Sequence, residues 1–234
     1  GKYRVVRPLA SGGMSELFLA RQILDDGRQR AVVVKRLLRR LMEVPAQLAM
    51  FVNEGRILSN LDHPNVVKVF EMGTSNDNYF LIMEYLRGAP LEELLKEANA
   101  AKMEMPLELV VHVVERTRAA LNHVHTNKDD VGQSLGLVHR DLNAGNLMIT
   151  FRGEVKLVDF GLAKMTTSPD ATKGGELKGT YAYMSPEQCR GEDIDARSDL
   201  FTLGVMLYEL CCRRRLFRRN TEFATLAAIL EDEI

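Results

Sequence analysis

The hydrophobic periodicity of the sequence changes at Leu91, and this change is the strongest constraint on the fold. Before it, short runs rich in β-branched and aromatic residues alternate with turn signals such as Ser-Gly-Gly and Asp-Asp-Gly, a pattern typical of an antiparallel sheet. After it, apolar residues recur at three- and four-residue intervals, as they do on one face of a helix. The sequence therefore predicts an α+β chain with its strands first and its helices second.

The individual elements follow from the same signals. Helical spacing over Pro45–Leu58 predicts a helix that interrupts the strands, and Leu107–His125 carries apolar residues on one helical face. A further helix is expected over Thr221–Glu231. The predicted strands are Tyr3–Leu9, Leu17–Ala20, Ala31–Lys35, Val66–Met72 and Tyr79–Tyr85. Five strands and one helix should thus form the first part of the chain.

The composition excludes several classes of protein. With 46% hydrophobic residues among 234, the chain is too apolar for a disordered segment. A net charge of -1 offers no field for nucleic acid or an anionic membrane, and no apolar run reaches the ~18 residues of a membrane span. Cys189, Cys211 and Cys212 have no metal-ligand spacing and fit a reducing compartment. We expect a cytoplasmic protein, or the intracellular domain of a longer one, without nucleic-acid or membrane contact.

Two polar segments carry the chemistry. The first is His139–Asn146, with the sequence HRDLNAGN, and the second, Asp159–Gly161, begins thirteen residues after Asn146. Asp141, Asn146 and Asp159 place two carboxylates and one side-chain amide in these segments, and their oxygen atoms are ligands of the kind that hold Mg²⁺. Short apolar runs flank them and predict small strands that would hold the polar groups in place.

In this order and spacing, the segments resemble the catalytic motifs of the eukaryotic-type protein kinase family, and bacterial Ser/Thr kinases in particular. The resemblance covers Tyr3 to Glu231. It implies a bilobal fold with an N-lobe over residues 1–83, a hinge at 84–86 and a helical C-lobe over 87–234. The family continues for about two further helices, so we expect a truncated C-lobe with an exposed apolar face.

The resemblance also implies an activity, the transfer of the γ-phosphoryl group of ATP to Ser/Thr hydroxyls of proteins. Asp141 would orient the hydroxyl, and Asn146 and Asp159 would bind Mg²⁺, with Mn²⁺ as an alternative. Lys35, paired with Glu54, would position the phosphates. The expected ATP contacts are Leu9, Gly12, Gly13, Leu17, Val33, Lys35, Met83, Glu84, Leu86 and Met148.

Supporting residues are implied in the same way. Asp199 would start a buried central helix and brace the backbone of the 139–146 segment. His139 would be structural rather than a general base. Ser185-Pro186-Glu187 stands for the family's Ala-Pro-Glu, and we expect Glu187 to have no evident partner in this chain.

The chain departs from the family pattern at several positions. Asn143 stands where Ser/Thr kinases usually carry a lysine, so the site loses a positive charge near the γ-phosphate and we expect slow turnover. Val33 replaces the usual alanine of the adenine slot, and Ala10 and Ser15 replace two of three loop glycines. These departures keep a pseudokinase open as the alternative. A small-molecule phosphotransferase is disfavoured by the peptide-docking loop at Gly179–Glu187.

Regulation by phosphorylation is a further implication. Arg140, next to the catalytic acid, resembles the arginine of kinases whose loop is ordered by a phosphate, and Lys164 could share that anion. We favour Thr172 as the autophosphorylation site, with Glu176, four residues before Thr180, as an alternative source of negative charge. The expected partners are protein substrates with Ser or Thr, and a second copy of the chain for autophosphorylation.

Overall fold

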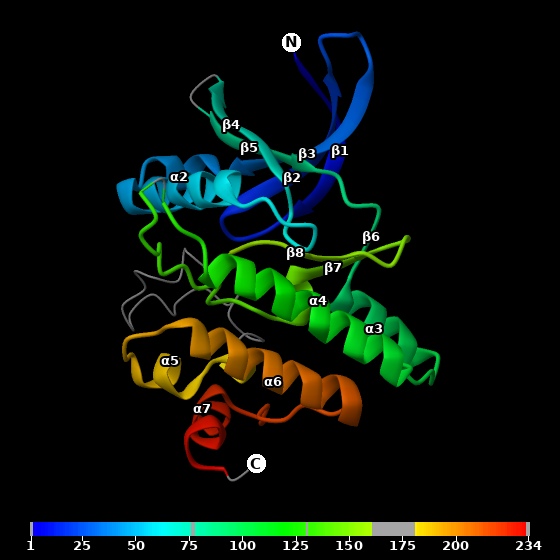
Figure 1. Ribbon diagram of the computed structural model, residues 1–234, viewed down its shortest axis with the longest axis vertical. Coiled ribbons are helices and arrows are strands. Elements are labelled where there is room, and N and C mark those ends of the chain that lie inside the picture. The colour runs from blue at the N-terminus through cyan, green and yellow to red at the C-terminus, as the bar shows by residue number, and fades with distance from the viewer. Residues whose placement is uncertain (1, 76–77, 130, 161–180, 233–234) are drawn as a thin grey trace. The chain divides into compact units, whose positions relative to one another are not determined.

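A computed structural model describes residues 2–75, 78–129, 131–160 and 181–232 (Figure 1). The chain forms two compact units. Unit 1 consists of residues 1–63 and 67–87, and unit 2 of residues 64–66 and 88–234. Each unit has its own β-sheet.

Unit 1 is built on a five-stranded antiparallel sheet with the strand order β1-β2-β3-β5-β4 (Figure 1). Its strands are β1 (Tyr3–Ser11), β2 (Ser15–Ile23), β3 (Gln29–Leu37), β4 (Val69–Ser75) and β5 (Asn78–Glu84). Ala20, Val32 and Ile82 are fully buried on this sheet. The expected α+β class with an antiparallel five-stranded sheet followed by a helical part is confirmed.

The long helix of unit 1, α2 (Pro45–Asn60), follows the short α1 (Arg39–Met42) and contacts β4. Gly55 lies where α2 approaches the sheet most closely. A Cβ atom at this position would lie 2.5 Å from the Leu81 Cδ2 and 2.8 Å from the Met72 Sδ. Glycine therefore allows α2 to pack this closely on β4 and β5.

Unit 2 is mainly helical and carries a three-stranded antiparallel sheet. The strands, in spatial order, are β6 (Gly88–Pro90), β7 (Leu147–Thr150) and β8 (Val155–Leu157). The helices are α3 (Leu91–Ala100), α4 (Leu107–His125), α5 (Pro186–Arg190), α6 (Ala196–Cys212) and α7 (Glu222–Glu231), with 3-10 turns η1 (Ala144–Asn146) and η4 (Tyr181–Tyr183). The helical character expected after Leu91 is confirmed.

Helices α4 and α6 lie side by side and form the centre of unit 2 (Figure 1). The apolar stripe of α4 is buried as predicted, from Val110 to Val124. Helix α6 buries polar residues as well as apolar ones, among them Ser198, Asp199 and Thr202. Because a buried polar group must be hydrogen-bonded to be tolerated, these side chains indicate where unit 2 is held by specific contacts.

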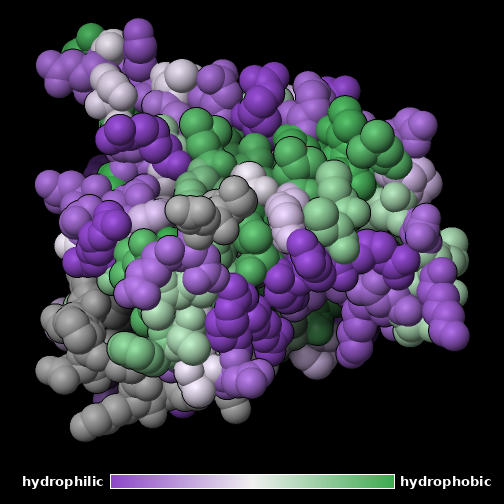
Figure 2. All heavy atoms as spheres, turned by 90° about the horizontal axis from the view of Figure 1, so that it is seen from below, coloured by the Kyte–Doolittle hydropathy of each residue, from purple (hydrophilic) through white to green (hydrophobic). Residues whose placement is uncertain are grey.

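The α7 end of unit 2 exposes apolar side chains, and the view from this side shows hydrophobic patches among hydrophilic ones (Figure 2). On α6, Leu200 and Leu207 are exposed, and on α7 Phe223 and Leu230 are exposed, with Phe223 at 82%. Within the described residues, no helix combines the length and the apolar character that a membrane span requires.

The close contact at Gly55 leads to a stability prediction. In Gly55→Ala the new methyl group collides with Leu81, which is fully buried, so we expect the free energy of unfolding to fall by about 1 kcal/mol despite the better helix propensity of alanine. Gly204→Ala on α6 is the matched control. A Cβ there has no neighbour within 4 Å in the described part of the chain, so it should stabilise by up to ~1 kcal/mol. Equal stabilisation of both variants in urea unfolding would contradict this account.

Candidate functional site

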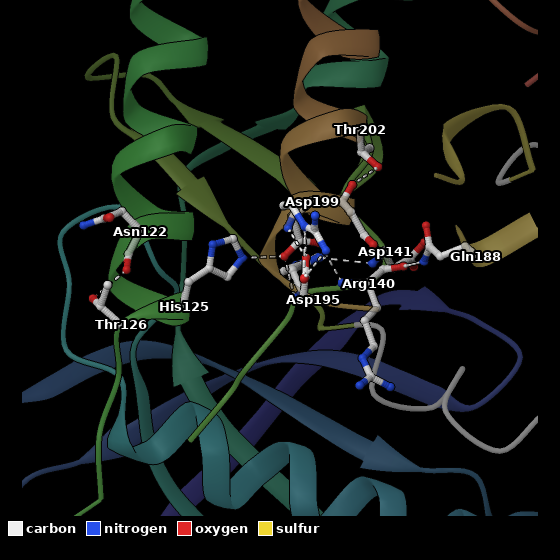
Figure 3. A network of polar contacts seen from close by, with 12 residues as sticks. Asn122, His125, Thr126, Arg140, Asp141, Gln188, Asp195, Asp199 and Thr202 are labelled. Atoms are coloured by element: carbon white, nitrogen blue, oxygen red, sulfur yellow. Dashed lines mark hydrogen bonds and ion pairs between the residues drawn. The ribbon is translucent and has the colours of Figure 1, made fainter. Parts of the chain in front are cut away.

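The start of the 139–146 loop of unit 2 is bound by the buried carboxylate of Asp199. The backbone N–H groups of His139 and Arg140 donate hydrogen bonds of 2.8 and 2.9 Å to the two oxygens of Asp199. The His125 Nε2 lies 2.7 Å from the Asp199 Oδ2. Figure 3 shows His125 from α4 and Arg140 from the loop converging on Asp199 in the first turn of α6. The expected bracing role of Asp199 is confirmed by these contacts.

The electrostatics of Asp199 follow from this arrangement. Burial by itself would raise the pKa of the Asp199 carboxyl, since Asp199 is 1% exposed. The hydrogen bond from His125, the nearby His139 ring and the two backbone N–H donors favour the ionised form. They outweigh burial, so the pKa of Asp199 lies below its usual value. The carboxylate is therefore charged at neutral pH.

The backbone at Arg140 has an unusual conformation, with φ at +68°. Only glycine enters this left-handed region without cost, so the surrounding contacts must hold Arg140 there. Two of them act on adjacent peptide groups. The Arg140 N–H donates to Asp199, and the Arg140 carbonyl oxygen accepts a bond of 3.1 Å from the Gln188 Nε2.

Gln188 is fixed by the start of α5. The Ser185 and Gln188 side chains each bond the other residue's backbone N–H and so form a capping box. The structure corrects the expectation that Glu187 has no evident partner. The Ser198 hydroxyl on α6 donates a short hydrogen bond to the Glu187 carboxylate. A serine hydroxyl carries no sequence signal for such a contact, so sequence reasoning missed it.

Asp141 receives hydrogen bonds from two side-chain amides of its own loop. The Asn143 Nδ2 lies 2.9 Å from the Asp141 carbonyl oxygen and 3.4 Å from its Oδ1. The Asn146 Nδ2 lies 2.8 Å from the same carbonyl oxygen and 3.2 Å from the Asp141 Oδ2. The Asn143 Oδ1 in turn accepts from the Gly145 N–H at 2.8 Å and caps η1. Both carboxylate oxygens of Asp141 are therefore directed by neighbouring amides.

The β7–β8 hairpin brings Asn146 and Asp159 to one end of the small sheet. Leu147, the first residue of β7, pairs with Leu157, the last residue of β8. The Val158 N–H donates to the Asn146 carbonyl oxygen at 2.9 Å. An amide oxygen and a carboxylate are hard ligands that suit Mg²⁺, which typically takes one or two protein carboxylates and completes its shell with phosphates and water. Among the described residues no cluster of three or more His, Cys, Asp or Glu that could hold a metal ion is found.

His139 is a structural residue in this arrangement. Its side chain is fully buried, and its ring centroid lies 4.6 Å from that of Phe160. Burial is the main reason that the pKa of His139 lies below its usual value, although nearby carboxylates such as Asp199 oppose it. The ring is thus held neutral, and its Nδ1 accepts a 3.3 Å hydrogen bond from the Asp141 N–H. These contacts support the expectation that His139 is not a general base.

In unit 1, Lys35 on β3 pairs with Glu54 on α2. The Lys35 Nζ lies 2.7 Å from the Glu54 Oε1, and the side chains are only 10% and 11% exposed. The structure thus brings together the two residues that the family resemblance had paired. Gly55 lies next to Glu54, so the close packing of α2 also sets the position of this carboxylate.

Three of the expected ATP contacts share the sheet face of Lys35. Strand register places Leu17 opposite Lys35, and Met83 opposite Val33. Because residues opposite each other in a sheet point to the same side, as do residues two apart along a strand, these side chains lie on one face.

The remaining expected ATP contacts are less constrained. Gly12 donates to the Ser15 carbonyl oxygen at 2.9 Å in the β1–β2 turn, and the Gly13 carbonyl oxygen accepts from Arg40. Leu9 lies at an irregularity of the β1–β2 pairing. The other three are Glu84 at the end of β5, Leu86 after it, and Met148 on β7 of unit 2. Their roles toward ATP stay predictions.

Four of the expected regulatory residues cannot be placed. They lie outside the described residues and are Lys164, Thr172, Glu176 and Thr180. Conversely, the sequence analysis did not single out His125, whose side chain contacts Asp199 from helix α4. As the last residue of a predicted amphipathic helix it carried no signal, since polar residues at helix ends are usually solvated.

Comparison with known proteins identifies relatives over the whole chain. The family model described as "Protein kinase domain" matches residues 3–233. The tyrosine-protein kinase MasK of Myxococcus xanthus is 41% identical over 234 residues, which are 100% of this chain and 36% of MasK. The serine/threonine-protein kinase pkn3 of Myxococcus xanthus is 38% identical over 89% of this chain and 37% of pkn3.

More distant bacterial relatives agree. The serine/threonine-protein kinase PrkC of Bacillus subtilis is 32% identical over 92% of this chain and 31% of PrkC. The serine/threonine-protein kinase PknA of Mycobacterium tuberculosis is 35% identical over 93% of this chain and 48% of PknA. The chain therefore spans about a third to a half of the length of these curated relatives.

The Asp199 network predicts an acid dependence of stability. A carboxyl whose pKa is depressed in the folded state stabilises fully above its unfolded pKa, and this contribution is lost as the pH falls through the folded value. We therefore expect Asp199→Asn to lower the free energy of unfolding by at least ~2 kcal/mol at pH 7, because two N–H donors lose a charged acceptor. The gap to the parent should stay constant down to pH 5 and shrink below about pH 4.

The measurement is urea unfolding at several pH values, with Asp193→Asn, an exposed acid next to the same helix, as the control. A gap between Asp199→Asn and parent that is absent at pH 7, or that grows on acidification, would show that Asp199 is not the anchor of the loop.

Proposed function

Since the chain belongs to the protein kinase family, we propose that it transfers the γ-phosphoryl group of ATP to Ser or Thr hydroxyls of proteins. The observation that carries the proposal is the loop carboxylate of Asp141, which two amides orient, with Asn146 and Asp159 at the adjoining end of the β7–β8 hairpin. In this proposal residues 1–83, 84–86 and 87–234 are the N-lobe, hinge and C-lobe of one catalytic domain.

The chemistry assigned to unit 2 centres on Asp141. Its carboxylate accepts a hydrogen bond from the substrate hydroxyl and takes up the proton as the oxygen bonds to the γ-phosphorus and the bond to ADP breaks. Asn143 and Asn146 keep the carboxylate in place before the substrate arrives. Asn146 and Asp159 would hold Mg²⁺, with Mn²⁺ as an alternative. The metal supplies positive charge against the phosphate oxygens.

The role assigned to unit 1 is to hold ATP. The buried ion pair with Glu54 fixes the direction of the Lys35 ammonium, which would bind the phosphates. The apolar face with Leu17, Val33 and Met83 would take the adenine ring, since these side chains flank Lys35 on the same side of the sheet. The β1–β2 turn with Gly12 and Gly13 would cover the phosphates.

Tyrosine is a second candidate acceptor, and two observations favour it. Asn143 occupies the position at which Ser/Thr kinases usually carry lysine, and the relative with 41% identity is named a tyrosine-protein kinase. The larger number of relatives named serine/threonine-protein kinases keeps Ser and Thr as the leading proposal. Phosphoamino-acid analysis of the products decides between the acceptors.

A pseudokinase that binds nucleotide without turnover is the alternative function. The departures at Val33 and in the glycine loop favour it. The contacts around Asp141 weigh against it, because a chain that needed no chemistry would not need two amides on this carboxylate. Activation-loop autophosphorylation by a second copy of the chain remains a further proposal; its candidate residues other than Arg140 lie outside the described part.

Loss of the Asp141 carboxylate is the first test. We expect Asp141→Asn to reduce phosphate incorporation from labelled γ-ATP into a generic basic protein by at least ~100-fold, because the amide cannot accept the hydroxyl proton. Asp193→Asn should match the parent, and thermal unfolding should show that every variant is folded. If the folded parent incorporates nothing while ATP with Mg²⁺ raises its melting temperature, the pseudokinase takes the lead.

Two substitutions of Asn143 test separately the effect of charge at this position and the positioning of Asp141. Asn143→Ala removes the amide that holds Asp141, and we expect kcat to fall about tenfold, equivalent to ~1.4 kcal/mol. Asn143→Lys restores the family's positive charge and should exceed the alanine variant. An alanine variant with unchanged kcat would remove the positioning role, and a lysine variant no faster than alanine would remove the role of charge.

A further inference from the structure

The segment between α6 and α7 concentrates positive charge that the proposed chemistry does not use. Five of the seven residues from 213 to 219 are arginines, namely Arg213, Arg214, Arg215, Arg218 and Arg219. The chain as a whole has a net charge of -1, so this is a strong local excess. Which of these charges are already neutralised by the chain itself decides what the segment can bind.

Three arginines have carboxylate partners. Arg215 lies 2.7 Å from Glu209, Arg219 lies 2.5 Å from Asp232, and Arg213 has a longer contact of 3.8 Å with Glu104. Arg214 donates to the Tyr208 hydroxyl at 2.7 Å and lies near its ring.

Arg218 differs from these four. Among the described residues no carboxylate lies within ion-pair distance of its guanidinium. Because Arg214 is held by the Tyr208 hydroxyl, the charge of Arg218 is the one in this segment that an external anion can use without breaking an ion pair or a side-chain hydrogen bond within the described residues.

Arg218 lines a cavity of about 250 Å³. One part of the lining comes from Tyr181 and Ala182, and another from Arg218 and Arg219. Glu222, in the first turn of α7, is the only carboxylate among the described lining residues. With a guanidinium and a carboxylate in the lining of one cavity, substitution of either residue should change its preference for anions.

The cavity is connected to the 139–146 loop by a short, fixed segment. From Tyr181 the chain runs through η4 to Gln188, whose side chain bonds the Arg140 carbonyl oxygen next to Asp141. Along the way, the Tyr183 carbonyl oxygen accepts from Thr202 at 2.7 Å. The segment that forms one part of the cavity lining therefore also contacts the backbone next to Asp141.

The Glu209 carboxylate on α6 is not available to a basic substrate. Glu209 is only 10% exposed in its side chain, and it accepts from the Tyr183 hydroxyl at 2.8 Å, from Arg215 at 2.7 Å and from the Leu216 N–H at 3.3 Å. With its acceptor positions occupied by the chain itself, Glu209 leaves the positive charge of Arg218 to dominate recognition here.

We propose that this cavity binds an anionic side chain of the protein substrate, close in sequence to the acceptor hydroxyl, with Arg218 as the binding cation. The anion is a carboxylate or the phosphate of an already phosphorylated residue. The proposal rests on the proposed function, because it assigns a substrate class to the same site.

The test uses one acceptor peptide in three forms, with flanking glutamate, phosphoserine or glutamine. We expect kcat/KM to be at least threefold higher for an anionic form than for the glutamine form, as for a partly exposed ion pair. Arg218→Ala should reduce this ratio about threefold, and Glu222→Gln should raise it. Arg118→Ala, on the exposed side of α4, is the control for loss of one arginine.

The outcomes separate this proposal from the general function. Equal kcat/KM for all three peptides in the parent, or a ratio in Arg218→Ala equal to that in Arg118→Ala, overturns the anion site and leaves the kinase function intact. If no peptide is phosphorylated, the kinase function fails. Fluorescence anisotropy with the labelled peptides then tests the anion site by itself. Threefold weaker binding of the anionic peptides by Arg218→Ala than by the parent supports the site, and equal binding overturns it.

Discussion

The geometry of unit 2 depends on one buried carboxylate. Asp199 lies in the first turn of α6 and accepts from His125 on α4 and from two consecutive peptide groups of the 139–146 loop. Because the folded chain excludes water from this carboxylate, its contacts are worth more than at a surface, and no solvent replaces them when one is lost. The strained backbone at Arg140 is the local cost of this arrangement. Asp199 thereby fixes both the contact between α4 and α6 and the start of the 139–146 loop.

The orientation of Asp141 follows from that fixed point. Once the backbone at Arg140 is set, the next residues turn so that Asn143 and Asn146 direct their amides at the Asp141 carboxylate. Such preorganised dipoles reduce the reorganisation required during a reaction. Asn143 stands where Ser/Thr kinases usually carry a positively charged lysine, and its amide therefore helps to order the loop.

Patterns along the chain predicted the parts of this structure that repeat or that are local. Helix α4 has the predicted bounds, because its apolar spacing is regular over five turns. The Lys35–Glu54 pair was expected from the resemblance to the protein kinase family, and the structure contains it. The predicted start of β4 was wrong. Val66 was assigned to this strand, but β4 begins at Val69 and Val66 pairs with Leu157 of the small sheet. Contacts between side chains far apart in sequence, such as His125 with Asp199, have no periodicity and could not be predicted.

The burial of the Lys35–Glu54 pair sets a limit on how this protein can be stabilised. Two ions that are nearly enclosed have lost most of their hydration, and in other proteins well-packed apolar residues in place of such pairs are often at least as stable. Selection for thermal resistance alone would therefore tend to replace these two residues with hydrocarbon side chains. In the proposed function, a more robust fold obtained in this way would lack the cation proposed to hold the phosphates, so at this position stability and activity would favour different sequences.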